Sequence, residues 1–313
     1  MIKNKNALLS EKIESLLRWT VESSMDEFFP ADLARLAKAR LNAAGDRHAH
    51  SWQSSHAQSA SERLSNSQMR DLVRFHLSLP VHPSGSVCTR CAQPMDAFGF
   101  HTSYCHAPFS REDQSSWPEL PTTHRRHNRI QHLLCEMARG TNSYSAVELE
   151  PTRLFAAPHA NHRPDIYLYD ARDGPTALDV VVTAPLQVAL VDAYASGRHD
   201  VAAARGEDAK VSKYTRLARS LRNPCRIIPV GLSAFGALGP RANAFVKDLA
   251  RRLCADRGIE RQLSHKLHRI RTKLCCIAQS HLADLIAVQN LRLLLPDGHI
   301  PTLEEALNAD VAI

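Results

Sequence analysis

Three cysteines and one histidine constrain the fold of this chain more than any other sequence feature. They follow the spacing Cys88-x2-Cys91-x9-His101-x3-Cys105. A structural zinc ion needs four such ligands, which proteins supply as two close pairs on a turn and a short helix or hairpin. A module this short cannot bury a core of its own, so metal binding would supply its folding energy. The spacing therefore predicts a zinc knuckle.

The neighbouring His106 is an alternative to His101, although its position beside Cys105 makes a less natural pair. The chain has 8 cysteines in 313 residues. Cys135, Cys225 and Cys254 lie in apolar periodic segments and are expected in the core. The cysteines are predicted to be thiols or metal ligands, because the protein is expected to be intracellular.

Hydropathy predicts a soluble protein that has no contact with a membrane. No stretch approaches the 18 apolar residues of a membrane-spanning helix. The first residues run into an amphipathic pattern without the apolar block and cleavage site of a signal peptide.

The net charge of +7 is concentrated in one part of the chain. Between Arg198 and Lys273, 18 Lys and Arg residues stand against 6 Asp and Glu residues, a local balance of +12. A surface of this kind suits a polyanion such as nucleic acid. Charge alone leaves open the alternative that these residues form ordinary solvated helix faces.

Hydrophobic periodicity predicts a core in the order helix, three strands, helix, strand. Such an order is typical of an α/β fold with a mixed sheet. Helical patterns cover Thr123–Arg139, about Ala202–Leu221 and Arg241–Cys254, and strand patterns cover Ala146–Glu150, Asp165–Tyr169, Ala177–Thr183 and Cys225–Leu232.

These patterns divide the chain into four predicted parts. Residues 1–80 form a helical N-terminal segment with a polar connector at 46–66, and residues 81–115 form the knuckle. A linker at 111–123 leads into the core at 120–255, and residues 256–313 form a helical extension.

Two carboxylates fall where strands of the predicted sheet meet. Asp165 opens the second strand and Asp179 lies inside the apolar run Leu178–Val181 of the third. Neighbouring strands of a hairpin bring such residues to one end of a sheet. Burying them costs free energy unless a divalent cation compensates. The pair therefore predicts a Mg²⁺ site that activates water against a phosphodiester.

Further candidates for this site flank the strands. Glu148 and Glu150 alternate with apolar residues, so either one completes the metal shell. Lys210 and Lys213 lie on the following helix beside Tyr214, where a lysine orients water or stabilises developing charge. Each residue taken singly is more often a strand-end cap or a solvated side chain, so the prediction depends on their order and spacing.

The joint pattern, over roughly residues 65–255, resembles the restriction-like endonuclease region of site-specific, early-branching non-LTR retrotransposons, whose core is of the PD-(D/E)XK type. The motifs that carry the resemblance are the knuckle, the tripeptide Arg126-His127-Asn128, Pro164-Asp165 with Asp179 after thirteen intervening residues, the Lys-x3-Tyr pair Lys210 and Tyr214, and the strand from Ile228 with the glycine-rich turn Gly236–Pro240.

This resemblance implies an Mg²⁺-dependent DNA endonuclease that cleaves target DNA to prime reverse transcription. It assigns Mg²⁺ to Asp165 and Asp179, with Glu150 preferred over Glu148 because Glu150-Pro151 resembles the family's segment. It makes Lys210 the catalytic lysine with Tyr214 as its neighbour, and gives the tripeptide Arg126-His127-Asn128 a role in organising the site or contacting DNA. It also implies a structural zinc ion, DNA and element RNA as partners, and a nuclear location.

Two departures from the family pattern bear on activity. The PD-(D/E)XK signature places a lysine at position 181, where this chain has Val181; the family draws its lysine from the following helix instead. A full-length relative is expected to carry a reverse transcriptase, yet the sequence has no Asp-Asp pair in a strand–turn–strand setting. The alternative functions are a catalytically decayed nucleic-acid-binding protein and a zinc-finger regulator with an unrelated α/β domain.

Overall fold

The computed structural model describes residues 31–54, 64–105, 107–108, 121–152, 154–170 and 172–294. Parts of several sequence predictions lie outside these ranges. They are residues 1–30 of the helical N-terminal segment, residues 55–63 of the polar connector, most of the linker at 111–123, the end of the extension at 295–313, and the alternative ligand His106.

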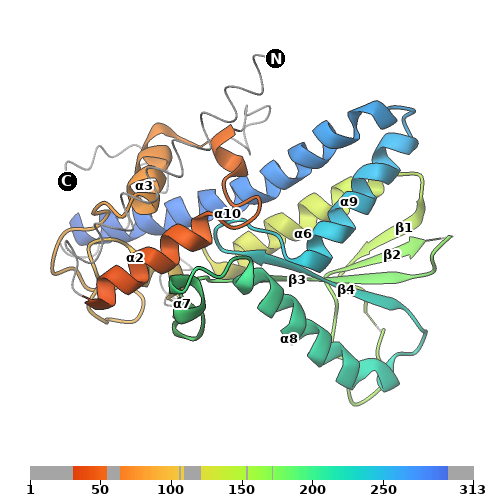
Figure 1. Cartoon of the computed structure of the whole chain (residues 1–313). Helices are drawn as coiled ribbons and strands as arrows, with labels where there is room; N and C mark the ends of the chain where they lie inside the picture. The colour runs from red at the N-terminus through yellow and green to blue at the C-terminus, as the bar shows by residue number, and fades with distance from the viewer. Residues whose placement is uncertain are drawn as a thin grey trace.

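Helices precede, interrupt and follow a compact group of strands (Figure 1). The elements are α2 (Ala31–Ala44), η1 (Ser51–Ser54), α3 (Asn66–His76), α4 (Phe100–Tyr104), α6 (Thr123–Arg139), β1 (Tyr144–Leu149), β2 (Ile166–Asp170), β3 (Thr176–Thr183), α7 (Val188–Ala195), α8 (Val201–Leu217), η3 (Ala218–Ser220), β4 (Arg226–Ser233), α9 (Pro240–Ala255), η4 (Glu260–Gln262) and α10 (Leu263–Leu294).

The sheet is mixed and has the strand order β1-β2-β3-β4, which confirms the predicted α/β class. β1, β2 and β3 pair antiparallel, whereas β3 and β4 pair parallel. Parallel neighbours need a long crossover, and α8 supplies it between β3 and β4. The parallel register sets Asp179 opposite Pro229.

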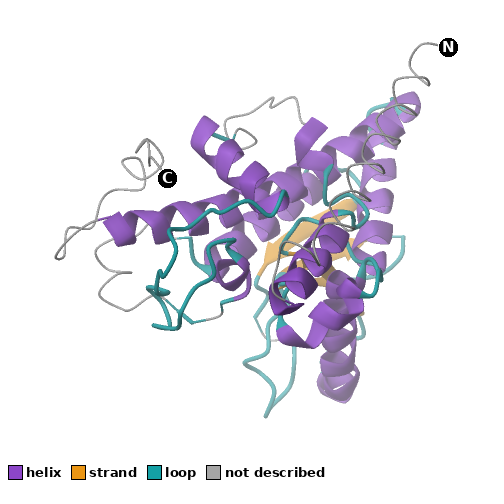
Figure 2. Cartoon of the chain, turned by 60° about the vertical axis from the view of Figure 1, so that its left-hand side comes forward, coloured by secondary structure: helices purple, strands orange, loops and turns teal. Residues whose placement is uncertain are grey.

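Helices cover both faces of the sheet, as Figures 1 and 2 show. On one face, apolar residues of α6 and α9 such as Ile130 and Phe245 pack on Leu178 and Val180 of β3. On the other face, Tyr214 of α8 packs in a smaller cluster with strand residues whose side chains point to that side of the sheet, such as Tyr167 and Ala177. The first five residues of β3 are all buried. A central strand flanked on both faces is expected to have this near-continuous burial.

The N-terminal helices form a second core with α7, η1 and part of α10. Trp52 lies in the stretch predicted as a polar connector, yet it is only 3% exposed and belongs to this core. α7 was not predicted as an element. Its sequence is almost uniformly apolar, so it gives no amphipathic period.

α10 is one continuous helix of 32 residues that runs along the whole molecule (Figure 1). It contacts α3, η1, α4, α6 and α9. Its buried polar side chains bond to distant loops; the Gln279 amide, for example, donates to the Phe235 carbonyl at 2.8 Å. Among the described helices, none has the length and apolar character needed to cross a bilayer.

Candidate functional site

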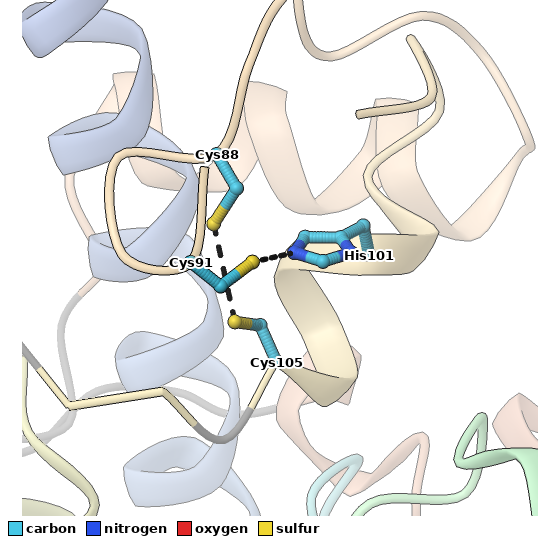
Figure 3. Close-up of side chains that lie close together, drawn as sticks. All are labelled: Cys88, Cys91, His101 and Cys105. Atoms are coloured by element: carbon cyan, nitrogen blue, oxygen red, sulfur yellow. Dashed lines mark hydrogen bonds between the residues drawn. The ribbon is translucent and has the colours of Figure 1, made fainter. Parts of the chain in front are cut away.

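The four predicted zinc ligands converge in the structure (Figure 3). Cys88 Sγ lies 3.9 Å from Cys105 Sγ, and Cys91 Sγ lies 3.2 Å from His101 Nε2. The four ligand atoms all lie within 4.8 Å of one another. Three soft thiol ligands and one imidazole match a closed structural zinc site. This cluster could therefore hold a metal ion such as zinc.

Local backbone geometry brings the two ligand pairs together. Cys88 and Cys91 lie on a turn closed by the bridge between Val87 and Pro94. His101 lies on α4, whose first N–H groups bond to the Asp96 carboxylate at 2.9 to 3.0 Å. A carboxylate in this position accepts hydrogen bonds from amides that would otherwise be unpaired, and its negative charge interacts favourably with the positive end of the helix dipole.

The knuckle is anchored to α10 through buried polar contacts. The His82 imidazole lies 2.6 Å from Asn290 Oδ1 and 2.8 Å from the Thr102 hydroxyl. The Gln289 side chain accepts from the Thr89 hydroxyl at 2.9 Å and donates to the Val87 carbonyl. The knuckle is therefore built into the protein body.

Asp165 lies just before β2 and is held by three groups. His127 Nε2 lies 3.0 Å from its Oδ1, the Val180 N–H donates to its Oδ2, and the Gln131 amide donates to its backbone carbonyl at 2.8 Å. Burial works to raise the pKa of Asp165, but the hydrogen bond and charge of His127 and the Val180 N–H outweigh it and hold the pKa below its ordinary value. This carboxylate is stabilised in its ionised form.

Asp179 lies in the middle of β3, next to Asp165, and is 3% exposed. Lys210 Nζ on α8 donates to its Oδ1 at 2.9 Å, while Lys213 Nζ is 4.0 Å from its Oδ2. Burial raises the pKa of Asp179; the ammonium group of Lys210 opposes the rise and the Asp165 carboxylate reinforces it. Lys210 is thus the lysine in hydrogen-bond contact with the pair.

Tyr214 lies at the buried end of this arrangement. Its ring stacks on Phe155, with centroids 6.1 Å apart, and the Lys213 ammonium lies 4.9 Å from the ring centre. Burial and the neighbouring Asp179 carboxylate raise its pKa above the ordinary tyrosine value. The Tyr214 hydroxyl and the Asp179 carboxylate are close enough for each to affect the pKa of the other, although neither the hydroxyl nor Asp179 Oδ2 has a partner with full hydrogen-bond geometry in the described part of the chain.

The two glutamates lie at the edge of this arrangement. β1 ends at Leu149, one residue before its predicted end, because Glu150 takes a left-handed backbone conformation with φ 46°. The Glu150 side chain is exposed and bonds to no other described residue; only its backbone N–H pairs with the Asp165 carbonyl. Glu148 accepts from the Tyr169 hydroxyl at 3.3 Å.

The members of the tripeptide at the start of α6 differ in their contacts, although His127 and Arg126 line the same cleft. His127 bonds to Asp165, Arg126 lines a cleft, and Asn128 is exposed. The contact of Gln131 with Asp165 was not predicted. The helical period could have indicated it, because Gln131 lies four residues after His127 on the same helix face.

A cleft of about 420 Å³ lies between the knuckle and the sheet. Its walls come from the knuckle, the start of α6, β3, α8 and α10. His127 and Lys210 line it while bonding to Asp165 and Asp179 respectively. The cleft therefore lies between the knuckle and the acidic pair.

No known protein family, curated protein or solved structure matches this chain. What the arrangement can do follows from its own chemistry. In the described ranges, the Cys88, Cys91, His101 and Cys105 cluster is the only set of three or more metal-ligand side chains. The acidic pair offers two carboxylates of the hard oxygen type that Mg²⁺ prefers. Asp179 Oδ2 is buried and accepts no hydrogen bond of full geometry from the described residues, with Lys213 Nζ 4.0 Å away.

Proposed function

We propose that this chain is a metal-dependent DNA endonuclease with a PD-(D/E)XK-like core that draws its lysine from the helix after the third strand. The observation that carries the proposal is the 2.9 Å contact between Lys210 Nζ and Asp179 Oδ1, next to a second carboxylate, Asp165. Position 181 holds valine, so α8 is the element that brings a lysine to the pair.

Each side chain has a chemical role in this proposal. His127 and the Val180 N–H keep Asp165 ionised and oriented. Lys210 holds a positive charge beside the pair, where it stabilises the charge that develops on a phosphodiester. Asp165 and Asp179 would hold Mg²⁺, which on binding supplies an activated water and neutralises phosphate charge.

The basic lining of the cleft supports DNA as the substrate. Arg126, His127 and Lys210 all border it, on elements that also position the acidic pair. A cation-rich cleft suits the phosphate backbone. The further proposals, namely target-primed retrotransposition, element RNA as a second partner and a nuclear location, are supported only by the motif resemblance.

One observation favours a second candidate, a catalytically decayed nucleic-acid-binding protein. The Glu150 carboxylate is exposed and makes no contact with Asp165 or Asp179 within the described residues. A two-carboxylate site binds a divalent cation less firmly than a three-carboxylate site, because charge count sets affinity. Such a protein would bind DNA through the same cleft without cutting it.

Nicking of supercoiled plasmid tests the proposal. We expect nicking by the zinc-loaded protein when Mg²⁺ is present and none when Mg²⁺ is omitted. Asp165→Asn and Asp179→Asn should each lower the rate at least about a hundredfold. Asp192→Asn is the matched control, since Asp192 is exposed on α7 and its carboxylate pairs with Arg35 among the residues that the structure describes.

DNA affinity measured on the same samples separates the two candidates. Nicking that the two site variants abolish supports the endonuclease. A folded, zinc-loaded protein that binds DNA but does not nick it supports the decayed binding protein instead.

A further inference from the structure

Arg126 is the most unusual cation of the cleft. It lies in the second turn of α6, lines the cleft, and its Nε is buried without a hydrogen-bond partner among the described residues. Burial lowers its pKa to about 10. The Arg126 side chain is half-buried, and a guanidinium in that position with no carboxylate partner among the described residues costs free energy. This cost is relieved when an anion enters the cleft.

Other positive charges converge on the same place. His281 of α10 also lines the cleft and is buried. Burial and the charges of Arg126, Arg90, Arg129 and Arg125 push its pKa well below the ordinary value. Burial first, and then the four guanidinium charges, thus favour the neutral imidazole of His281. The beginning of α6 adds the positive end of a helix dipole.

The opposite wall belongs to the zinc module. Arg90 lies between Cys88 and Cys91 in the sequence and donates to the carbonyl oxygens of Cys105 and Thr102 at 3.1 and 3.2 Å. These bonds hold its guanidinium at the cleft, which it also lines. The ligand cluster and the anion-attracting wall are thus parts of one small structure.

We propose that this cleft binds one phosphate group of a nucleic-acid backbone through the Arg126 guanidinium, at a position beside the acidic pair and distinct from it. The choice of nucleic acid as the source of the phosphate rests on the proposed function. Lys210 and His127 border the same cleft and bond to the two carboxylates, so a strand seated on Arg126 continues toward them. Arg126 then fixes the register of the strand, since phosphate contacts position a nucleic acid.

The zinc module has a specific part in this binding. Without metal, the turn that carries Arg90 is tied to α4 only by the hydrogen bonds of Arg90 to Thr102 and Cys105, so this wall of the cleft is held less firmly. Zinc removal should therefore weaken binding of nucleic acid even though the acidic pair lies on other elements.

The test measures binding of a short fluorescein-labelled DNA duplex by anisotropy, at fixed salt and without Mg²⁺. Arg126→Gln should weaken binding about tenfold or more, while Arg126→Lys keeps most of it. Arg35→Gln removes the same charge from the exposed face of α2 and should leave binding unchanged. Melting curves establish that the variants are folded.

A second variant keeps Arg126 and changes the cleft. His124→Glu places a carboxylate at an exposed lining position, where the start of a helix tolerates it. It should also weaken duplex binding. Inorganic phosphate is the second probe and should bind far more weakly than the duplex.

Two results would overturn the proposal. One is equal duplex affinity for Arg126→Gln, His124→Glu and Arg35→Gln. The other is inorganic phosphate binding as tightly as the duplex, which would identify a site for free phosphate. Because binding is measured without Mg²⁺, failure of the nuclease proposal shows separately, as cleavage that survives Asp165→Asn or as an absence of cleavage.

Discussion

Glu207 of α8 accepts a hydrogen bond of 2.7 Å from the backbone N–H of Ala242 in the first turn of α9. The same fully buried carboxylate also accepts from the N–H groups of Arg241 and Gly231. A Cβ at Gly239 would come within 2.5 Å of it, so glycine is needed there. Glu207 precedes Lys210 by three residues, and this bond network therefore fixes the helix that presents the lysine.

Removing the Glu207 carboxylate should destabilise the protein strongly. Glu207→Ala leaves buried N–H groups without an acceptor, and we expect a loss of roughly 2–4 kcal/mol in the free energy of unfolding. Denaturant titration measures it. Glu136→Ala, on the exposed side of α6, is the control; a loss for Glu207→Ala no larger than that of the control would contradict this account.

Lys210 and Lys213 should differ in their effect on nicking. Lys210 touches Asp179 at 2.9 Å, whereas Lys213 stands at 4.0 Å. Lys210→Met should slow single-turnover nicking by about 10²- to 10³-fold, and Lys213→Met by less than about tenfold. Equal rates for the two variants would show that the other lysine replaces Lys210.

Metal removal should loosen the knuckle and its contacts with α10. We expect one zinc per chain by elemental analysis, and a fall in melting temperature of roughly 8 °C or more on removal. Cys91→Ser should reproduce the fall. Cys225→Ser should not, because Cys225 lies outside the ligand cluster; wild-type melting unchanged by metal loss would refute a structural role.

Asp46 should make stability depend on pH. Its carboxylate accepts from the Tyr194 hydroxyl and the Asp200 N–H at 2.6 Å, yet burial raises its pKa from 3.8 to about 6. Between about pH 4 and pH 6, Asp46 is therefore protonated in the folded state and ionised in the unfolded state. This contribution to stability is complete below about pH 4 and is lost as the pH rises through 6.

The Asp46 contribution can be isolated by substitution. The difference in free energy of unfolding between the wild type and Asp46→Asn should change by up to about 3 kcal/mol between pH 4 and pH 7, because the wild type loses stability relative to the variant. Urea unfolding at a series of pH values measures it. A difference that stays constant across this range would argue against a raised pKa.

Local patterns predicted most of the sheet and its helices. The structure gives α6 the predicted bounds Thr123–Arg139, because its apolar period and the cap at Gly140 are both strong. β1 is shifted at both ends, and no pattern announces the left-handed turn at Glu150. The continuity of α10 was also not predicted, since its buried Gln, His and Asn residues break the apolar period.

The sequence predicted that Asp165, Asp179 and Lys210 lie together, but it wrongly placed the Glu150 side chain with them and did not predict how these residues are held. The Asp165–His127 and Asp179–Lys210 contacts join residues chosen from motif order. The cleft beside them depends on α10 and the knuckle, which are far apart in the sequence. No local sequence pattern predicts a contact between segments so far apart, so Arg90 and His281 were not predicted to line the cleft.

The bond between His82 and Asn290 spans 208 residues. During translation the knuckle is synthesised long before the end of α10. The nascent knuckle is therefore exposed until the helix that later buries it has been made. At that stage only the hydrogen bonds within the knuckle and a metal bound by its four ligands can order it. Zinc loading should therefore come early in biogenesis, and docking of the last helix should be the step that completes the fold.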